Sequence, residues 1–158
     1  MACFGDAHTI ADVRRTFAYV FDAATTPGGG IPAIETFTVM GPFCVGRQEV
    51  VPVRVMHGEH PILGFRLGGF AYLTDCNRLD EAAWTLLAGL DVLVLDALRI
   101  RPHPTHFSLD EAVDVAARIG AGRTFFTHMC HDLPHEPTNA RLPQGMALAY
   151  DGLVLELP

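Results

Sequence analysis

Residues 91–98, DVLVLDAL, form a nearly unbroken apolar run, and this run decides the fold class. A short continuous apolar run of this kind is typical of a strand that is buried on both faces of a sheet. Further along, SLDE at 108–111 is a capping box that predicts the start of an amphipathic helix, and Gly120 predicts its end. A second short strand, TFFT at 124–127, follows. The order of strand, helix and strand therefore predicts a β-α-β unit.

The residues before this unit predict further strands. From 34 to 74, short β-branched and apolar runs are separated by glycine, proline or charged turns. The runs IETFTV, EVVPVRVMH, ILGFRLG and FAYLT indicate an antiparallel meander. Near the end of the chain, MALAY and LVLEL flank the turn signal Asp151-Gly152 and predict a hairpin. Strands followed by a β-α-β unit indicate a mixed α/β architecture with helices packed on sheets.

Two further helices and one loop are predicted from the remaining patterns. Apolar residues at helical spacing predict an amphipathic helix over 9–21, and a helical pattern also covers 81–87. The glycine-rich stretch TTPGGGIP at 25–32 neither follows a clear strand nor opens a helix. It therefore predicts a plain loop and not a phosphate-binding turn.

The composition limits the classes of function. The chain has 158 residues, enough for one domain, and its 49% hydrophobic content suggests that some apolar surface needs a partner. The net charge of −7 and the absence of lysine exclude a nucleic-acid-binding surface of clustered basic residues. The four scattered cysteines form no C-x-x-C pair and predict reduced thiols. Without a membrane-length apolar run or an export signal, the sequence predicts a cytoplasmic protein with no membrane partner.

Polar residues close several of the predicted strands. His57, Asp75, Asp96 and His128 each stand at the C-terminal end of an apolar strand. Any one of them could simply cap a backbone group or lie in water. Together they favour a functional site, because ligands and catalytic groups of layered α/β folds commonly gather at such an edge. Imidazole nitrogens and carboxylate oxygens are the ligands of zinc, manganese or iron in hydrolytic sites.

The sequence resembles a known family over nearly its whole length. The segments that carry the resemblance are HGEHPILGFRLGGFAYLTDCNRL at 57–79, GLDVLVLDALRIRPHPTHFSLDEA at 89–112, THMCHDLPHE at 127–136 and LPQGMALAYDGLVLE at 142–156. They resemble the C-terminal half of a metallo-β-lactamase-fold hydrolase, closest to the branch containing the cyclic phosphodiesterase of phosphonate breakdown. FGDAHTIADVRRTFAYVF at 4–21 is similar to the segment that follows the principal metal motif of this family. The resemblance implies an α/β fold of the metallo-β-lactamase type, here an incomplete αββα sandwich of mixed sheets with helices packed outside.

The same resemblance implies roles for four residues. His57 matches a ligand of the first metal ion, Asp75 a carboxylate that bridges two ions, and His128 a ligand of the second ion. His106 is similar to an active-site histidine that serves as a general acid or contacts the phosphate. The implied cofactors are two divalent ions, zinc or manganese, because the same nitrogen and oxygen ligands suit both metals.

The other histidines receive no such role. His8, His60 and His103 match no functional position and are expected to be polar surface residues. Three roles stay open for His131 and His135: support of the metal ligands, contact with the substrate, or neither of these.

The family's signature, a His-x-His-x-Asp-His loop, is absent from the sequence. Residues 1–158 therefore resemble the C-terminal part of one hydrolase domain, and each ion would keep two of these protein ligands. Zinc sites use about three or four protein ligands, so weak or partial occupancy is expected. An unpaired sheet edge is also expected, through which the chain could form a homo-oligomer.

Two hypotheses of different class follow. The first is a dinuclear metal-dependent hydrolase that acts on a small phosphodiester or similar ester through a metal-bound hydroxide, with activity impaired in this chain alone. The alternative is a truncated, non-catalytic fragment or a partner-binding piece that exposes a sheet edge. The resemblance disfavours a third interpretation, a small α/β binding domain without metal.

Overall fold

The computed structural model describes residues 1–22 and 30–157, which form two compact units, Met1–Phe43 and Cys44–Pro158. Most of the predicted loop at 25–32 lies outside the described residues, and residues 30–32 have no helix or strand. The prediction that residues 1–158 form a single domain stays a prediction, since two compact units can belong to one domain. None of the helices in the described ranges has the length and apolar character needed to cross a membrane.

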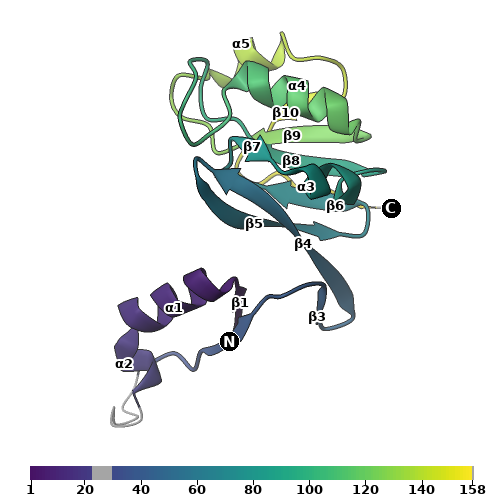
Figure 1. Ribbon diagram of the computed structural model, residues 1–158. Helices are drawn as coiled ribbons and strands as arrows, with labels where there is room; N and C mark the ends of the chain where they lie inside the picture. Colours follow the sequence, from purple (N-terminus) through teal and green to yellow (C-terminus); the bar gives the residue numbers. More distant parts are fainter. Residues whose placement is uncertain (23–29, 158) are drawn as a thin grey trace. The chain divides into compact units, whose positions relative to one another are not determined.

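The smaller unit contains two strands and two helices (Figure 1). These are β1 (Ala2–Gly5), α1 (Ala7–Thr16), α2 (Ala18–Phe21) and β2 (Glu35–Thr38). β1 pairs with β2 in parallel, so the prediction that IETFTV belongs to the antiparallel meander is wrong. A strand pattern shows which residues are extended but does not name the pairing partner, and β1 is too short to be found by periodicity. The helix predicted over 9–21 is divided in two at Phe17, where ψ is 40°.

The larger unit is built on one mixed sheet with the strand order β10-β9-β8-β6-β5-β4-β3, and β7 pairs with β4. Its strands are β3 (Phe43–Val45), β4 (Gln48–His57), β5 (His60–Leu67), β6 (Phe70–Leu73), β7 (Arg78–Leu79), β8 (Val92–Asp96), β9 (Arg123–Thr127) and β10 (Met146–Leu148). Its helices are α3 (Glu81–Leu86), α4 (Leu109–Ile119) and α5 (His135–Asn139). β4, β5 and β6 are antiparallel neighbours, as the meander predicts, whereas β6, β8 and β9 are parallel.

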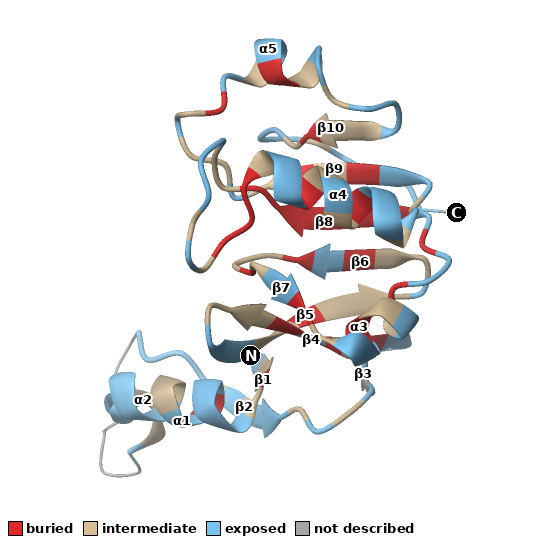
Figure 2. Ribbon diagram, turned by 45° about the horizontal axis from the view of Figure 1, so that its top comes forward, coloured by how far each residue is buried: buried red, intermediate tan, exposed pale blue. Residues whose placement is uncertain are grey.

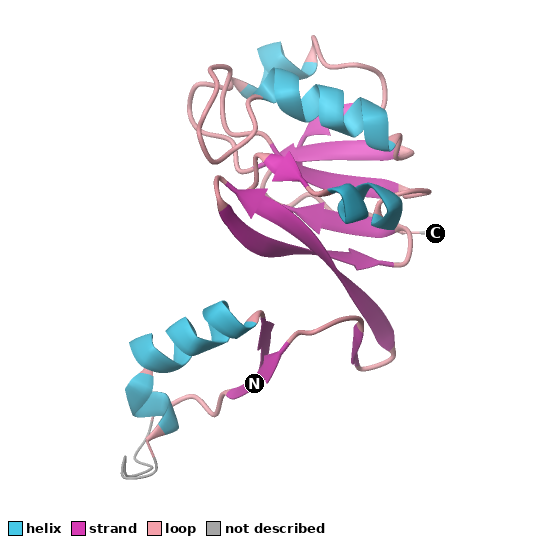
Figure 3. Ribbon diagram, in the orientation of Figure 1, coloured by secondary structure: helices cyan, strands magenta, loops and turns pink. Residues whose placement is uncertain are grey.

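The core lies between this sheet and the helices α3 and α4, which lie on the same face of the sheet (Figure 3). All five residues of β8 are buried, which confirms the prediction of a fully buried strand (Figure 2). The capping box is present, because Ser108 and Glu111 each accept the backbone N–H of the other. Gly120 ends the helix at φ 70°, a left-handed conformation that favours glycine. The β-α-β unit around residues 91–98 is therefore confirmed.

The predicted hairpin at the end of the chain is wrong. β10 pairs in parallel with β9, and residues 153–157 form no strand. The turn itself is present, since the Leu153 N–H donates to the carbonyl oxygen of Tyr150 at 3.1 Å. The chain between β9 and β10 includes α5, and it brings Met146–Leu148 back to the sheet parallel to β9. β10 therefore pairs with β9 and not with the residues that follow the turn.

Gly64 in β5 provides a test of this packing. A Cβ added there would meet the side chain of Leu73 and would lie 2.9 Å from the carbonyl oxygen of Tyr72. Because a paired strand cannot easily move away, we expect Gly64→Ala to lower the free energy of unfolding by about 2 kcal/mol, measured by urea denaturation. Gly41→Ala is the control, since a Cβ there would meet nothing within 4 Å. Equal stability of the two variants would contradict this packing.

Candidate active site

The polar strand ends identified in the sequence meet at one edge of the sheet. His57 is the last residue of β4, Asp96 is the last residue of β8, Asp75 follows β6, and His128 follows β9. β4 and β6 run in the same direction, because both are antiparallel to β5, and β6, β8 and β9 are parallel. Their C-terminal ends therefore lie at the same edge, as the sequence predicts.

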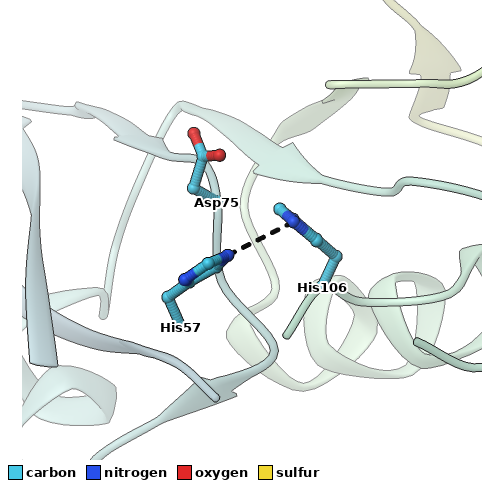
Figure 4. Close-up of side chains that lie close together, drawn as sticks. All are labelled: His57, Asp75 and His106. Carbon is cyan, nitrogen blue, oxygen red and sulfur yellow. Dashed lines mark hydrogen bonds between the residues drawn. The ribbon is translucent and has the colours of Figure 1, made fainter. Parts of the chain in front are cut away.

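Four predicted site residues form one cluster of side chains. His57 Nε2 lies 3.3 Å from His106 Nε2 (Figure 4), and His128 Nε2 lies 3.4 Å from an oxygen of Asp75. The rings of His106 and His128 are stacked with their centroids 4.9 Å apart. His106 is thus adjacent to both flanking imidazoles, and the structure brings together all four residues that the resemblance singles out.

Asp75 and His128 have an unusual backbone. Their φ angles are 56° and 65°, and no other non-glycine residue in the described part of the chain has a positive φ. This left-handed conformation is costly for most side chains and tends to occur at functional sites. It turns the chain sharply just beyond β6 and β9, where the two side chains come within 3.4 Å of each other.

Asp96 holds the backbone of the site residues in place through hydrogen bonds, a role that the sequence did not predict. It is fully buried, and its carboxylate accepts the N–H of Asp75 at 3.2 Å and the N–H of Phe107 at 3.1 Å. One of its oxygens also lies 3.5 Å from His106 Nδ1. Burial raises the pKa of the Asp96 carboxyl to about 6, against the lowering influence of His128 and the two N–H donors. The available signal was a charged residue that closes an otherwise apolar strand.

His106 is the most enclosed imidazole of the cluster, with 9% of its surface exposed. Its Nδ1 is buried and has no hydrogen-bond partner within bonding geometry. Burial lowers the pKa of His106, and the neighbouring His128 and His57 lower it further. The ring is therefore held neutral near pH 7 and has a nitrogen that another group can engage.

The remaining histidines differ in their surroundings. His8 and His60 are exposed, as predicted, but His103 is half-buried with its ring centroid 5.0 Å from that of His106. That His103 is a polar surface residue stays a prediction, and its ring lies beside the cluster. The His131 side chain is 95% exposed and lies near Asp132. His135 contacts Asn139 and Tyr150, which do not belong to the cluster, and the roles of His131 and His135 stay open.

The donor atoms fit a divalent metal ion. One ligand atom each from His57, Asp75 and His106 lie within 4.8 Å of one another, and so do atoms of Asp96, His106 and His128. Imidazole nitrogens and carboxylate oxygens are the usual ligands of zinc and manganese in hydrolytic sites. The imidazole nitrogens of His57 and His106 face each other at 3.3 Å, and a cation held beside them would stabilise this arrangement.

Comparisons with known proteins identify the family and the fold of this chain. The family model described as a β-lactamase superfamily domain matches residues 1–129. The crystal structure of a new diphosphatase from the PhnP family is 40% identical, with a TM-score of 0.88, and the match covers 97% of this chain and 56% of that one. Zinc-bound PqqB from Methylobacterium extorquens is 20% identical, with a TM-score of 0.77 over 99% of this chain and 65% of that one, and shows the fold alone.

A curated relative, an octanoyltransferase of Porphyromonas gingivalis, is 30% identical over 155 residues. The match covers 97% of this chain and 32% of the relative. The chain thus spans about a third of the curated relative and little more than half of the PhnP-family diphosphatase. The family model covers most of the chain, and the observed mixed α/β architecture agrees with it. The chain belongs to the β-lactamase superfamily and has a fold of the metallo-β-lactamase type.

Proposed function

We propose that the cluster of His57, Asp75, His106 and His128 serves the metal-dependent hydrolysis of a small phosphodiester, diphosphate or similar ester. The observation that carries this proposal is the convergence of three strand ends and one loop, which brings these four side chains together at a single edge of the sheet. The identity of 40% to a PhnP-family diphosphatase supports phosphorus chemistry.

In this proposal His57, Asp75 and His128 would hold two divalent ions, zinc or manganese. The bound ions supply Lewis-acid polarisation of a phosphoryl oxygen. Asp75 could contribute to holding either ion, because it lies 3.4 Å from His128 and shares a possible ligand group with His57. Two protein ligands for each ion are fewer than the usual three or four. We therefore propose weak, partial occupancy by this sequence on its own.

His106 is proposed to donate a proton to the leaving group. Its lowered pKa leaves the ring mostly neutral near pH 7, so the proposed donor is the minor protonated form, which is a stronger acid than an ordinary imidazolium. Its burial excludes most bulk water, and Asp96 Oδ1, 3.5 Å from Nδ1, lies on the side of the ring away from His57. The proposed division of labour is therefore that His57, Asp75 and His128 bind metal and His106 transfers the proton.

Metal removal and replacement test the proposed function. We expect the full chain, freed of metal by a chelator, to hydrolyse bis(p-nitrophenyl) phosphate only after zinc or manganese is added, with calorimetry measuring the metal affinity. His57→Ala should weaken this affinity by more than about tenfold, since it removes a proposed ligand. His60→Ala should leave it unchanged, because His60 is exposed, although it is the strand partner of His57 across the same hairpin. Metal-independent turnover, or equal effects of the two substitutions, would contradict the proposal.

A second candidate function is binding to a partner without catalysis. Large apolar side chains of the smaller unit favour it: Met40 is 90% exposed, Tyr19 54% and Phe37 43%. Exposed apolar surface commonly marks an interaction site. Sedimentation at increasing protein concentration distinguishes the candidates, because metal-free protein that self-associates and hydrolyses nothing would support the second.

A further inference from the structure

The loop before α4 is fixed in place on both sides of His103. Arg99 donates from Nε to the carbonyl oxygen of Arg101 at 3.1 Å and from Nη2 to that of Pro102 at 2.8 Å. Asn77 donates to the carbonyl oxygen of Pro104 at 2.8 Å and accepts the N–H of Gly58, which follows His57, at 3.0 Å. The loop is therefore tied to the turn that carries His57, and its side chains are held in defined positions next to the cluster.

Hydrogen bonding also fixes the tautomer of His103. The backbone N–H of Thr105 points at His103 Nδ1 at 3.3 Å, and the Thr105 hydroxyl lies 3.2 Å from the same atom. A backbone N–H can only donate, so Nδ1 must accept and carry no proton. The neutral ring then has its hydrogen on Nε2. Burial, followed by the nearby Arg99, His106 and His57, lowers the pKa of His103 and so keeps this ring neutral.

His103 lies beside the cluster, next to the ring of His106. The His103 ring lies 5.0 Å from the His106 ring, centroid to centroid, and is only half-buried. Its Nδ1 is satisfied by Thr105, whereas Nε2 has no hydrogen-bond partner within the ranges 1–22 and 30–157. A donor that is held in place but not used by the protein is suited to bind a ligand oxygen.

We infer that His103 is a substrate-binding residue that donates a hydrogen bond from Nε2 to a phosphoryl oxygen of the substrate bound beside His106. This inference rests on the proposed function, because it assumes a phosphorus-containing substrate. A neutral donor binds the ground state and the transition state in a similar way, so its loss raises KM and leaves kcat nearly unchanged.

Two substitutions at His103 separate binding from a structural role. His103→Asn keeps an oxygen that can accept the Thr105 N–H, as asparagine commonly does two residues before an N–H, but it removes the Nε2 donor. His103→Gln places an amide N–H near the position of Nε2. We expect His103→Asn to weaken the binding of inorganic phosphate and to raise KM by up to about tenfold, with an unchanged melting temperature. His103→Gln should recover most of this loss, and His60→Asn should change neither quantity.

Nitrogen-15 NMR of the metal-free and metal-loaded full chain gives a readout independent of turnover. The His103 ring should show the Nε2–H tautomer, and inorganic phosphate should shift its Nε2 signal. Wild-type phosphate affinity and KM in His103→Asn would overturn the inference. An equal loss in both His103 variants with a lowered melting temperature would also overturn it, since the role would then be structural. Phosphate binding at His103 without metal-dependent hydrolysis would overturn the proposed function alone.

Discussion

A His128→Ala variant is expected to lose metal-dependent hydrolysis by about a hundredfold or more. His128 is the proposed ligand of one ion, and its imidazole lies 3.4 Å from the carboxylate of Asp75. With few protein ligands for each ion, the removal of one leaves a single carboxylate, which holds a divalent cation poorly. Turnover of bis(p-nitrophenyl) phosphate at saturating zinc or manganese, together with calorimetric metal affinity, measures the effect.

The backbone at His128 requires a matched variant. Its φ of 65° is less favourable for alanine than for histidine, so His128→Ala combines ligand loss with a small destabilisation of the turn. Asparagine tolerates this conformation, so His128→Asn removes the imidazole with less strain. Both variants should lose activity to a similar extent, and His128→Asn should be the more stable one. His131→Ala, at a side chain that is 95% exposed, serves as the control and should retain activity. Full activity of His128→Asn would remove this residue from the proposed metal site.

The sequence predicted the parts of the fold whose signals are local. The apolar run at 91–98, the capping box at 108–111 and the glycine at 120 all specify structure through their own residues, and each of these elements is observed. Strand pairing is not local. The parallel partners of β2 and β10 lie far away in the sequence, and no feature of ETFT or MAL identifies them. The antiparallel meander was predictable because its strands are joined by short turns.

The candidate site was likewise predictable only in part. His57, Asp75 and His128 could be expected to converge, because each closes a strand and strand ends of one direction meet at one edge. The proposed contribution of His103 could not be predicted from the sequence, because it depends on a hydrogen bond from Thr105 within a folded loop. Asp96 was visible as a strand end, but its bonds to Asp75 and Phe107 depend on how two loops pass over β8.

Removal of the Asp96 carboxylate should destabilise the fold and disturb the site together. In Asp96→Ala, the N–H groups of Asp75 and Phe107 lose their acceptor in a buried environment. An unpaired buried donor costs about 1–3 kcal/mol, so we expect the free energy of unfolding to fall by about 3 kcal/mol. The left-handed turn at Asp75 also loses a fixed contact, and metal affinity should fall by about tenfold. Urea denaturation and calorimetry measure the two effects.

Asp96→Asn separates the hydrogen bonds from the charge. The asparagine oxygen can accept one of the two N–H groups, so the loss of stability in Asp96→Asn should be smaller than that in Asp96→Ala.

Because burial raises the pKa of Asp96 from 3.8 to about 6, the folded chain binds a proton more tightly than the unfolded chain. The stabilisation from this proton is complete below about pH 4 and is lost as the pH rises to about 6. In the presence of a chelator, the stability advantage of wild type over Asp96→Asn should therefore decrease across this range. An advantage over Asp96→Asn that grows with pH would mean that hydrogen bonds to the ionised carboxylate outweigh its desolvation.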